Sequence, residues 1–248
     1  MNSVVRLVAL GVGAYFLFLL ATFPATFVSA ALEERSADLS LNGVSGTVFS
    51  GQAAQVVYQD LDLGTLHWQL RPSRLLLGRL EYRLQLDNPA NAGHLTAGRT
   101  LTGRTYISDM DLEVLPGRLV NHYSPFPLSS SGTMRLVFET LSPGDDYSGE
   151  VAGRVIWRDA AILEPVSLVL GKLKMAVSTR DGQLVGQFTD SGDFGVSGEV
   201  ALSPVNEYRV DLLLRPRSAI DADIEVVLEQ FSQRQANGDY RIDLSGQF

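Results

Sequence analysis

The fold is decided by a stretch that reads Gly43-Val-Ser-Gly46-Thr-Val-Phe-Ser-Gly51 and continues, after a further alternating run, with Leu66-His-Trp68-Gln-Leu70-Arg-Pro72-Ser-Arg-Leu75-Leu-Leu-Gly78-Arg-Leu80. Apolar and polar residues alternate from Leu66 to Arg71, and successive side chains of a strand point to opposite faces of a sheet. Pro72 lacks the N–H that a strand ladder needs, so it ends this strand, and Gly78 permits the turn into the next one. The pattern is typical of antiparallel strands with one buried face.

Trp68 shares its face with Leu66 and Leu70. We therefore expect its side chain to fill the core where two strands meet, with Leu75 or Leu76 of the link covering it. An exposed partner-binding hot spot is the alternative, for Trp68 as for Trp157, but both residues are in phase with apolar neighbours, which favours core packing. In the following strand, residues 80–87 alternate again, and Glu81 falls on the polar face.

Composition limits the classes of function. The chain has 248 residues, of which 45% are hydrophobic and 19% charged, which suits a folded protein with a membrane segment. The formal net charge is −8 and no basic tract occurs, which argues against nucleic acid as a partner. The chain has no cysteine, which excludes disulfides, thiolate metal sites and cysteine nucleophiles.

Residues 7–32 contain no charged side chain and are long enough to cross a bilayer as a helix. Arg6 precedes this segment and Glu33 and Glu34 follow it. The positive-inside rule then places residues 1–6 in the cytoplasm and the main domain in the periplasm. A signal peptide cleaved after Ala30 is the alternative. We favour a retained transmembrane anchor, because the apolar stretch exceeds the usual 7–15-residue core of a signal peptide.

The remaining chain predicts two β halves, residues 33–128 and 129–248. A change of parity indicates a bulge near Gln59 and Asp60, and residues 87–103 have the composition of an exposed loop or weak edge. One soluble helix is predicted over about residues 219–235, with Ser218 as N-cap, Asp221 in its first turn and Asn237 to Asp239 ending it. A last alternating strand follows from residue 240.

The stretch quoted first resembles the protein N family of the bacterial type II secretion system, also called the general secretion pathway. The C-terminal helix and the ending Gly238-Asp-Tyr-Arg-Ile-Asp-Leu-Ser-Gly246 fit the same family. The residues that carry the motif are Gly46, Gly51, Trp68, Leu70, Pro72, Leu75 and Gly78. The resemblance implies a non-enzymatic accessory subunit of the inner membrane that supports export of folded periplasmic proteins across the outer membrane. It implies other inner-membrane subunits of the system as partners.

Side chains that could carry chemistry are few. The three histidines, His67, His94 and His122, are far apart in sequence and none has a metal-ligating residue at a suitable spacing. No nucleophile elbow, phosphate-binding loop or dinucleotide-binding fingerprint occurs in the sequence. Asp109, Asp111 and Glu113 alternate on one strand, and a solvated strand face is a better interpretation than a cation site. We predict no catalytic residue, no cofactor and no metal.

The fold class that follows is mostly β: an N-terminal transmembrane helix, then a twisted, largely antiparallel β-sheet domain with a short helix near the C-terminus. A second hypothesis for function comes from a different class. Long twisted sheets with one apolar face also occur in bridge-like lipid carriers of the AsmA type, which the chain resembles in its singly anchored, strand-rich layout. Under that hypothesis membrane lipid is the partner, and the apolar face is a groove for acyl chains.

Overall fold

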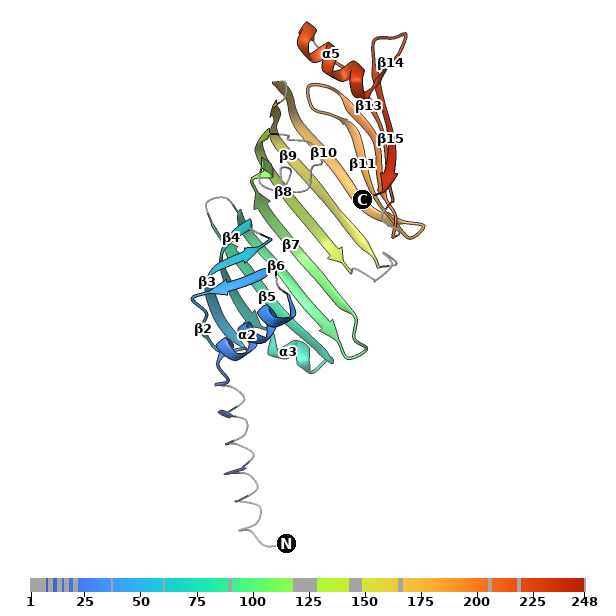
Figure 1. The fold of residues 1–248 in the computed structure, drawn as a ribbon. Helices are drawn as coiled ribbons and strands as arrows, with labels where there is room; N and C mark the ends of the chain where they lie inside the picture. Colours follow the sequence, from blue (N-terminus) through green and yellow to red (C-terminus); the bar gives the residue numbers. More distant parts are fainter. Residues whose placement is uncertain are drawn as a thin grey trace. The chain divides into compact units, whose positions relative to one another are not determined.

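The computed structural model describes most of the chain. The described residues are 8, 11–12, 15, 18–19, 22–36, 38–59, 61–88, 91–117, 129–142, 149–164, 167–204, 207–217 and 220–247, without the side chains of 190 and 191. The chain forms two compact units, Met1–Pro89 (unit 1) and Ala90–Phe248 (unit 2). Figure 1 shows the helices and strands of the two units, coloured along the chain. The boundary predicted after residue 128 follows a stretch outside the described residues and stays a prediction.

Among the described residues, unit 1 forms a small antiparallel sheet with helical segments beside it. The strand order is β1-β3-β4-β5, and the short β2 pairs with β3. Its strands are β1 (Leu39–Asn42), β2 (Ser45–Gly46), β3 (Ser50–Tyr58), β4 (Leu61–Leu70) and β5 (Arg79–Asp87). Its helices are α2 (Ala25–Arg35) and the single turn α3 (Pro72–Leu75) between β4 and β5.

The alternating run that crosses residue 59 is a hairpin. Tyr58 pairs with Leu61, and Gln59 has a positive φ of 47°, which is the left-handed conformation of a tight turn. The bulge predicted at this point is therefore wrong: the parity changes because the chain reverses and begins a new strand. The irregular register of this hairpin lies inside β3, between Ala53 and Val57.

The uncharged N-terminal stretch does not run as one helix into α2. Pro24 is extended, with φ −65° and ψ 139°, and forms an isolated antiparallel bridge with Thr47. The amide of Val48 donates a hydrogen bond of 3.0 Å to the carbonyl of Phe23. The described residues contain no helix that is both long and apolar enough to cross a membrane.

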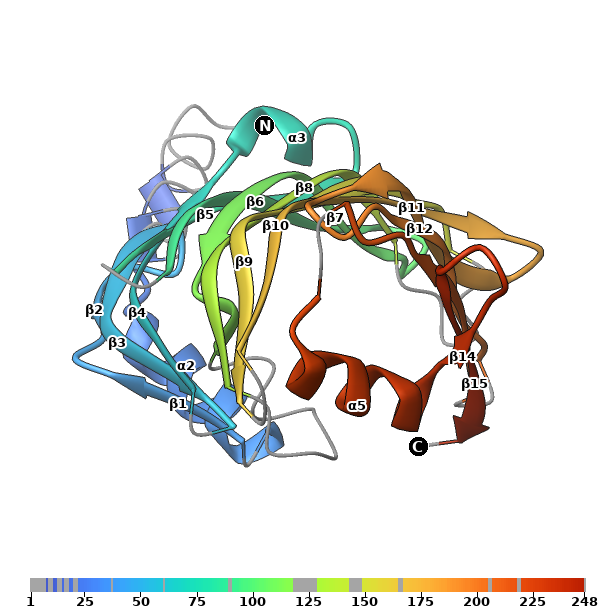
Figure 2. The ribbon, with the colours of Figure 1, turned by 90° about the horizontal axis from the view of Figure 1, so that it is seen from above.

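Unit 2 is a larger antiparallel sheet whose strands lie mostly in chain order. The order is β6-β7-β8-β9-β10-β11-β12-β13-β15-β14. The strands are β6 (Asn91–Thr100), β7 (Thr105–Val114), β8 (Ser129–Leu141), β9 (Val151–Glu164), β10 (Leu168–Arg180), β11 (Gln183–Ser191), β12 (Val196–Leu202), β13 (Glu207–Leu214), β14 (Gln233–Arg234) and β15 (Tyr240–Gln247). The sheet curves, and α5 (Ala222–Phe231) lies inside the curve (Figure 2).

Of the two alternatives for residues 87–103, an exposed loop or a weak edge, the loop is wrong, because the strand β6 occupies most of this range and is the first strand of unit 2. β6 pairs with β7 from Asn91 to Arg99. Its glycines, which weaken a strand signal, stand where the neighbouring strand needs space. A Cβ on Gly93 would lie 2.1 Å from the carbonyl oxygen of Asp111, and one on Gly98 would lie 2.4 Å from the ring of Tyr106.

The helix near the C-terminus is confirmed, but it is shorter than predicted. It begins after Asp221, which is the N-cap residue without a side-chain cap hydrogen bond, while Ser218 lies outside the described residues. It ends at Phe231, because Gln233 and Arg234 pair with β15 as the short strand β14. The residues from Asn237 to Asp239 therefore form the turn between β14 and β15.

The core of unit 2 lies between α5 and one end of its sheet. Trp157, Ile224 and Ile242 pack against this cluster from three different elements. The cluster consists of Ala160, Leu170, Leu173, Phe194, Val196, Leu214, Leu228 and Tyr240. The mostly β, antiparallel fold class is thus confirmed, with an open sheet and few helices.

Candidate functional site

The first motif residues of unit 1 form a compact contact around Trp68. The indole Nε1 donates a hydrogen bond of 3.0 Å to the carbonyl of Thr47. Gly51 lies opposite Trp68 on β3, and a Cβ there would come within 2.5 Å of the indole ring. Gly46, with φ 90°, lies against Gly51 on β2. The indole thus packs on the bare backbone of Gly51, whereas Gly46 is required by the backbone, since a Cβ there would lie 2.7 Å from the Ser50 carbonyl oxygen and from the Gly51 Cα.

The later motif residues shape the link from β4 to β5. Leu70 is buried at the end of β4, Pro72 is the first residue of α3, and Gly78 closes the link with φ 67°. The predicted cover over Trp68 is wrong. Leu75 is 46% exposed and Leu76 is 90% exposed, so these leucines point to solvent and leave the half-buried indole to its neighbours on β2 and β3.

Glu81 is the residue of this region that pattern reasoning placed incorrectly. It falls on the polar parity of β5, yet its side chain is only 5% exposed. Arg71 lies 2.7 Å from its carboxylate and Arg74 lies 3.6 Å from it. The amide of Arg71 also donates a 2.9 Å hydrogen bond to the carbonyl of Glu81. A buried carboxylate needs such partners, so Arg71 and Arg74 are the feature of the sequence that could have indicated the burial of Glu81.

Two of the three acidic residues of β7, Asp111 and Glu113, make ion pairs across the sheet. Arg135 donates two hydrogen bonds to Asp111, of 2.7 and 2.5 Å, and this contact holds the pKa of the Asp111 carboxyl below its usual range. Glu113 lies 3.8 Å from Arg158. In the described part of the chain, no group of three or more His, Cys, Asp or Glu side chains could hold a metal ion.

The three histidines are not brought together. His67 is exposed on β4 of unit 1, and His94 is exposed on β6 of unit 2. His122 lies outside the described residues. Neither described histidine lies in a cleft with a second titratable group that would form a nucleophile–base pair, so we assign no catalytic role to them.

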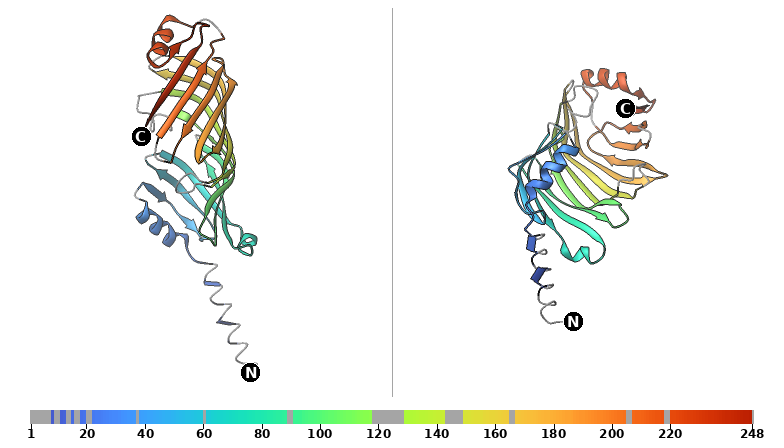
Figure 3. Two further views of the ribbon diagram at one scale, coloured as in Figure 1. Left: turned by 90° about the vertical axis from the view of Figure 1, so that its right-hand side faces the viewer. Right: turned by 60° about the horizontal axis from the view of Figure 1, so that its bottom comes forward.

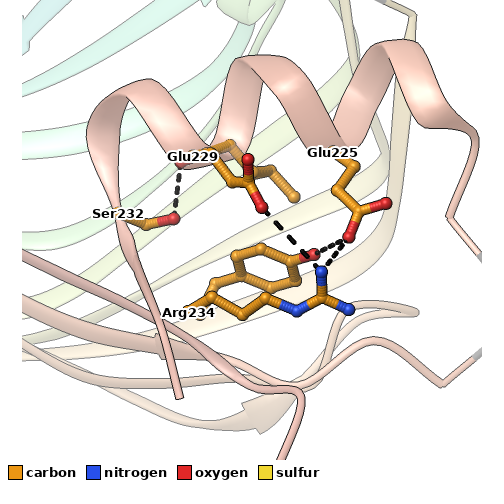
Figure 4. A network of polar contacts seen from close by, with 6 residues as sticks. Glu225, Glu229, Ser232 and Arg234 are labelled. Carbon is orange, nitrogen blue, oxygen red and sulfur yellow. Dashed lines mark hydrogen bonds and ion pairs between the residues drawn. The ribbon is translucent and has the colours of Figure 1, made fainter. Parts of the chain in front are cut away.

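A polar network holds α5 onto the end of the sheet in unit 2 (Figure 4). Arg234 of β14 contacts Glu225 and lies 3.8 Å from Glu229 of the helix. The hydroxyl of Tyr240 donates a 3.3 Å hydrogen bond to Glu225, and burial raises the pKa of Tyr240. Ser232 closes the helix by donating to the carbonyl of Leu228. These contacts fix the helix over the apolar core.

Asp239 is a second residue whose role pattern reasoning did not find. It is buried beside Tyr240, where Arg215 lies 3.2 Å from its carboxylate. The amide of Asn237 donates a 2.9 Å hydrogen bond to the same carboxylate, and the backbone N–H of Asp239 donates to the Asn237 side chain. The Asn-Gly-Asp sequence that was read as a helix end is thus a tight turn, stabilised by its own side chains.

One face of the unit 2 sheet is apolar over several strands. Across β8, β9 and β10, neighbouring positions carry apolar side chains or glycine in three rows: Met134, Trp157 and Leu173; Leu136, Val155 and Met175; Phe138, Gly153 and Val177. The first row approaches α5, since Leu173 belongs to the core cluster and Trp157 packs against it. The Trp157 indole donates a 2.9 Å hydrogen bond to the Ser131 carbonyl. Core packing of Trp157 is thus confirmed.

The rows beyond α5 are the candidate interaction surface, which we call the apolar face. It comprises Leu136, Phe138, Val155 and Met175, all of which are half-buried. The opposite face of the same strands carries polar and charged residues, such as Arg154 and Lys174, which are exposed. A surface of this kind suits binding and offers no reacting group.

Comparison with known proteins matches the family model "Type II secretion system (T2SS), protein N" over residues 37–243. The chain belongs to the type II secretion system protein N family. That match runs from β1 to the first half of β15 and includes the Trp68 contact, the apolar face and the turn at Asp239. The resemblance inferred from the motif residues is therefore confirmed, and it places the chain in a family of secretion-system components.

Three relatives are named type II secretion system protein N. The protein from Vibrio cholerae is 28% identical over 221 residues, which cover 84% of this chain and 85% of the relative. The protein from Aeromonas hydrophila is 28% identical over 257 residues, or 99% of both chains. The protein from Klebsiella pneumoniae is 26% identical over 234 residues, covering 90% of this chain and 88% of the relative. No solved structure matches the chain significantly.

Proposed function

We propose that the protein is a non-enzymatic accessory subunit of the type II secretion machinery in the inner membrane. The observation that carries this proposal is the family match over residues 37–243. In this role it supports the export of folded periplasmic proteins across the outer membrane and works with other inner-membrane subunits. The packed tryptophans and paired charges of the two units suit such a binding role.

The proposed topology is a single pass with residues 1–6 in the cytoplasm and both units in the periplasm. The uncharged segment 7–32, with Arg6 before it and Glu33 and Glu34 after it, supports this orientation. Within this segment, Phe23 and Pro24 contact the backbone of Val48 and Thr47 between β2 and β3, and α2 follows them.

Mass spectrometry of the mature protein tests the anchor. We expect an intact N-terminus and recovery of the protein with the inner membrane. A mature chain that begins at Ala31 would show instead that the segment is a cleaved signal peptide, and the single-pass topology would then be rejected.

Deletion and complementation test the function itself. Removal of the protein should reduce secretion of a type II substrate, with the substrate accumulating folded in the periplasm, and the intact chain should restore secretion. Photo-cross-linking in the native envelope should attach the chain to other inner-membrane secretion subunits. Unchanged secretion, or cross-links to unrelated proteins alone, would contradict the proposal.

A lipid-carrying β-sheet of the AsmA type is the second candidate function, and the apolar face favours it. A photo-cross-linking residue at Phe138 on the apolar face should capture phospholipid under this hypothesis. The same residue at Gln187, which is exposed on the opposite face of the unit 2 sheet, is the matched control. Protein adducts at both positions, without lipid at Phe138, would favour the secretion subunit alone.

A further inference from the structure

The link between β4 and β5 exposes consecutive leucines, which form what we call the leucine tip, Leu75 to Leu77. Leu75, Leu76 and Leu77 are 46%, 90% and 65% exposed, and Leu80 just beyond them is also exposed. Single exposed leucines are common on protein surfaces, but a contiguous exposed group marks an interaction site. The single turn α3 and the left-handed Gly78 hold the leucines outside the sheet.

The leucine tip lies within a basic sequence of an acidic chain. Residues 71–83 contain four arginines and one glutamate, whereas the whole protein has 28 acidic and 20 basic residues. Glu81 is buried against Arg71 and Arg74, so its charge is compensated inside unit 1. Arg79 and Arg83 are exposed. The local surface is therefore cationic as well as apolar.

In Figure 1 and in the left view of Figure 3, α2 and the turn α3, which carries Leu75, lie near the lower end of unit 1, and Figure 2 shows them on different sides of its strands. The helix α2 also exposes apolar side chains, among them Phe27 at 66% and Leu32 at 45%. Its residues up to Leu32 belong to the uncharged N-terminal segment, although the extended Pro24 separates it from the residues before it. Unit 1 therefore exposes two apolar elements, of which α2 contains the last residues of the segment proposed to enter the bilayer.

We propose that the leucine tip inserts into the interfacial layer of an anionic bilayer, with the neighbouring arginines against lipid phosphates. This inference rests on the proposed membrane anchoring and adds a second contact point for unit 1. Leucines flanked by arginines match the two parts of a membrane surface, since the leucines enter the acyl boundary and the guanidinium groups bind phosphate. The contact would fix how unit 1 stands on the membrane.

The absence of cysteine makes a direct test simple. The full chain carrying Leu76→Cys is labelled with an environment-sensitive fluorophore and reconstituted into vesicles of phosphatidylethanolamine and phosphatidylglycerol. Val226→Cys is the matched control. Val226 is 58% exposed on α5, but the acidic Glu225 and Glu229 beside it oppose contact with anionic lipid.

We expect nitroxide-labelled lipid to quench the probe at residue 76 several-fold more than the probe at residue 226. Adding Arg79→Glu to the Leu76→Cys chain, or replacing phosphatidylglycerol by phosphatidylcholine, should reduce this quenching. Arg79 is an exposed residue at the start of β5, so its replacement leaves the core of unit 1 intact.

The alternative outcomes separate this inference from the proposed anchoring. If the chain floats with the vesicles while only aqueous iodide quenches residue 76, the anchor stands and the inference is overturned. If the chain does not float at all, the anchoring fails and the inference fails with it. If residue 76 is shielded only when other secretion subunits are added, the leucine tip is a protein-docking site, which also overturns the inference.

Discussion

The contact between Trp68 and Gly51 makes a quantitative test of unit 1. Complete truncation of a buried tryptophan costs about 3–5 kcal/mol, and we reduce this to about 2–4 kcal/mol because the indole is half-buried. Trp68→Phe keeps a ring over Gly51 but loses the 3.0 Å hydrogen bond to Thr47, so it should cost about 1 kcal/mol. The expected order of stability is wild type, Trp68→Phe, Trp68→Ala.

Gly51→Ala approaches the same contact from the other strand. The new Cβ would lie 2.5 Å from both the carbonyl oxygen of Ser45 and the Trp68 ring, and overpacking of this kind costs about 1–3 kcal/mol. In a Trp68→Ala background the clash with the ring disappears, but the clash with Ser45 remains. The cost of Gly51→Ala should therefore fall by at least about 0.5 kcal/mol in the double variant.

Thermal unfolding of the purified full chain in detergent, followed by circular dichroism, measures these differences. Trp68→Ala should lower the Tm by roughly 5–15 °C for a chain of this size. His67→Ala, exposed one residue away, should change the stability by less than about 0.5 kcal/mol. An unchanged Tm for Trp68→Ala, together with loss of a partner cross-link, would refute the packing argument and make Trp68 a binding residue.

Three further results are expected. Asp111→Asn should flatten the loss of stability at low pH. The pKa of Asp111 in the folded protein lies below the ordinary 3.8, so the carboxylate stabilises the fold fully above pH 3.8 and loses that contribution as the pH falls further. A curve of stability against pH that is the same in the variant and the wild type would contradict this expectation. Leu228→Ala should cost about 2–5 kcal/mol in urea unfolding, while the exposed Val226→Ala should cost less than about 0.5 kcal/mol, and equal costs would reject the docking of α5. Secretion should survive simultaneous replacement of His67, His94 and His122 by alanine. Loss of secretion in a stably folded triple variant would revive a catalytic or metal-binding role.

Alternation was sufficient to predict most strands, because one face of each sheet is apolar and the other polar. It failed where a local contact overrides the pattern. The run through Gln59 predicts one bulged strand, since a hairpin that turns at a left-handed glutamine leaves little mark in the composition. The segment that forms β6 has the composition of a loop or weak edge, because Gly93 and Gly98 lower its strand propensity while giving space to the strand beside it.

Charged residues were the other source of error. Parity placed Glu81 in solvent, but parity says nothing about ion pairs, and Arg71 and Arg74 make its burial tolerable. The C-terminal helix was correctly predicted from its apolar spacing. Its end was misplaced, because β14 forms only through pairing with β15, a long-range contact that helical periodicity cannot reveal. The existence of the apolar face can be predicted from the alternation of apolar and polar residues, whereas its extent depends on which part of the sheet α5 covers.

The chain-order topology of unit 2 has a consequence for biogenesis. From β7 to β13 every strand pairs with the one made just before it, so each addition closes only the loop between consecutive strands and costs little chain entropy. A polypeptide that reaches its compartment from the N-terminus could add these strands one at a time, without waiting for distant partners. Only the last step differs, since β15 must join β13 after α5 and β14 have been made. We expect ribosome-stalled chains that end before residue 220 to form a protease-resistant sheet whose core is not yet covered by α5.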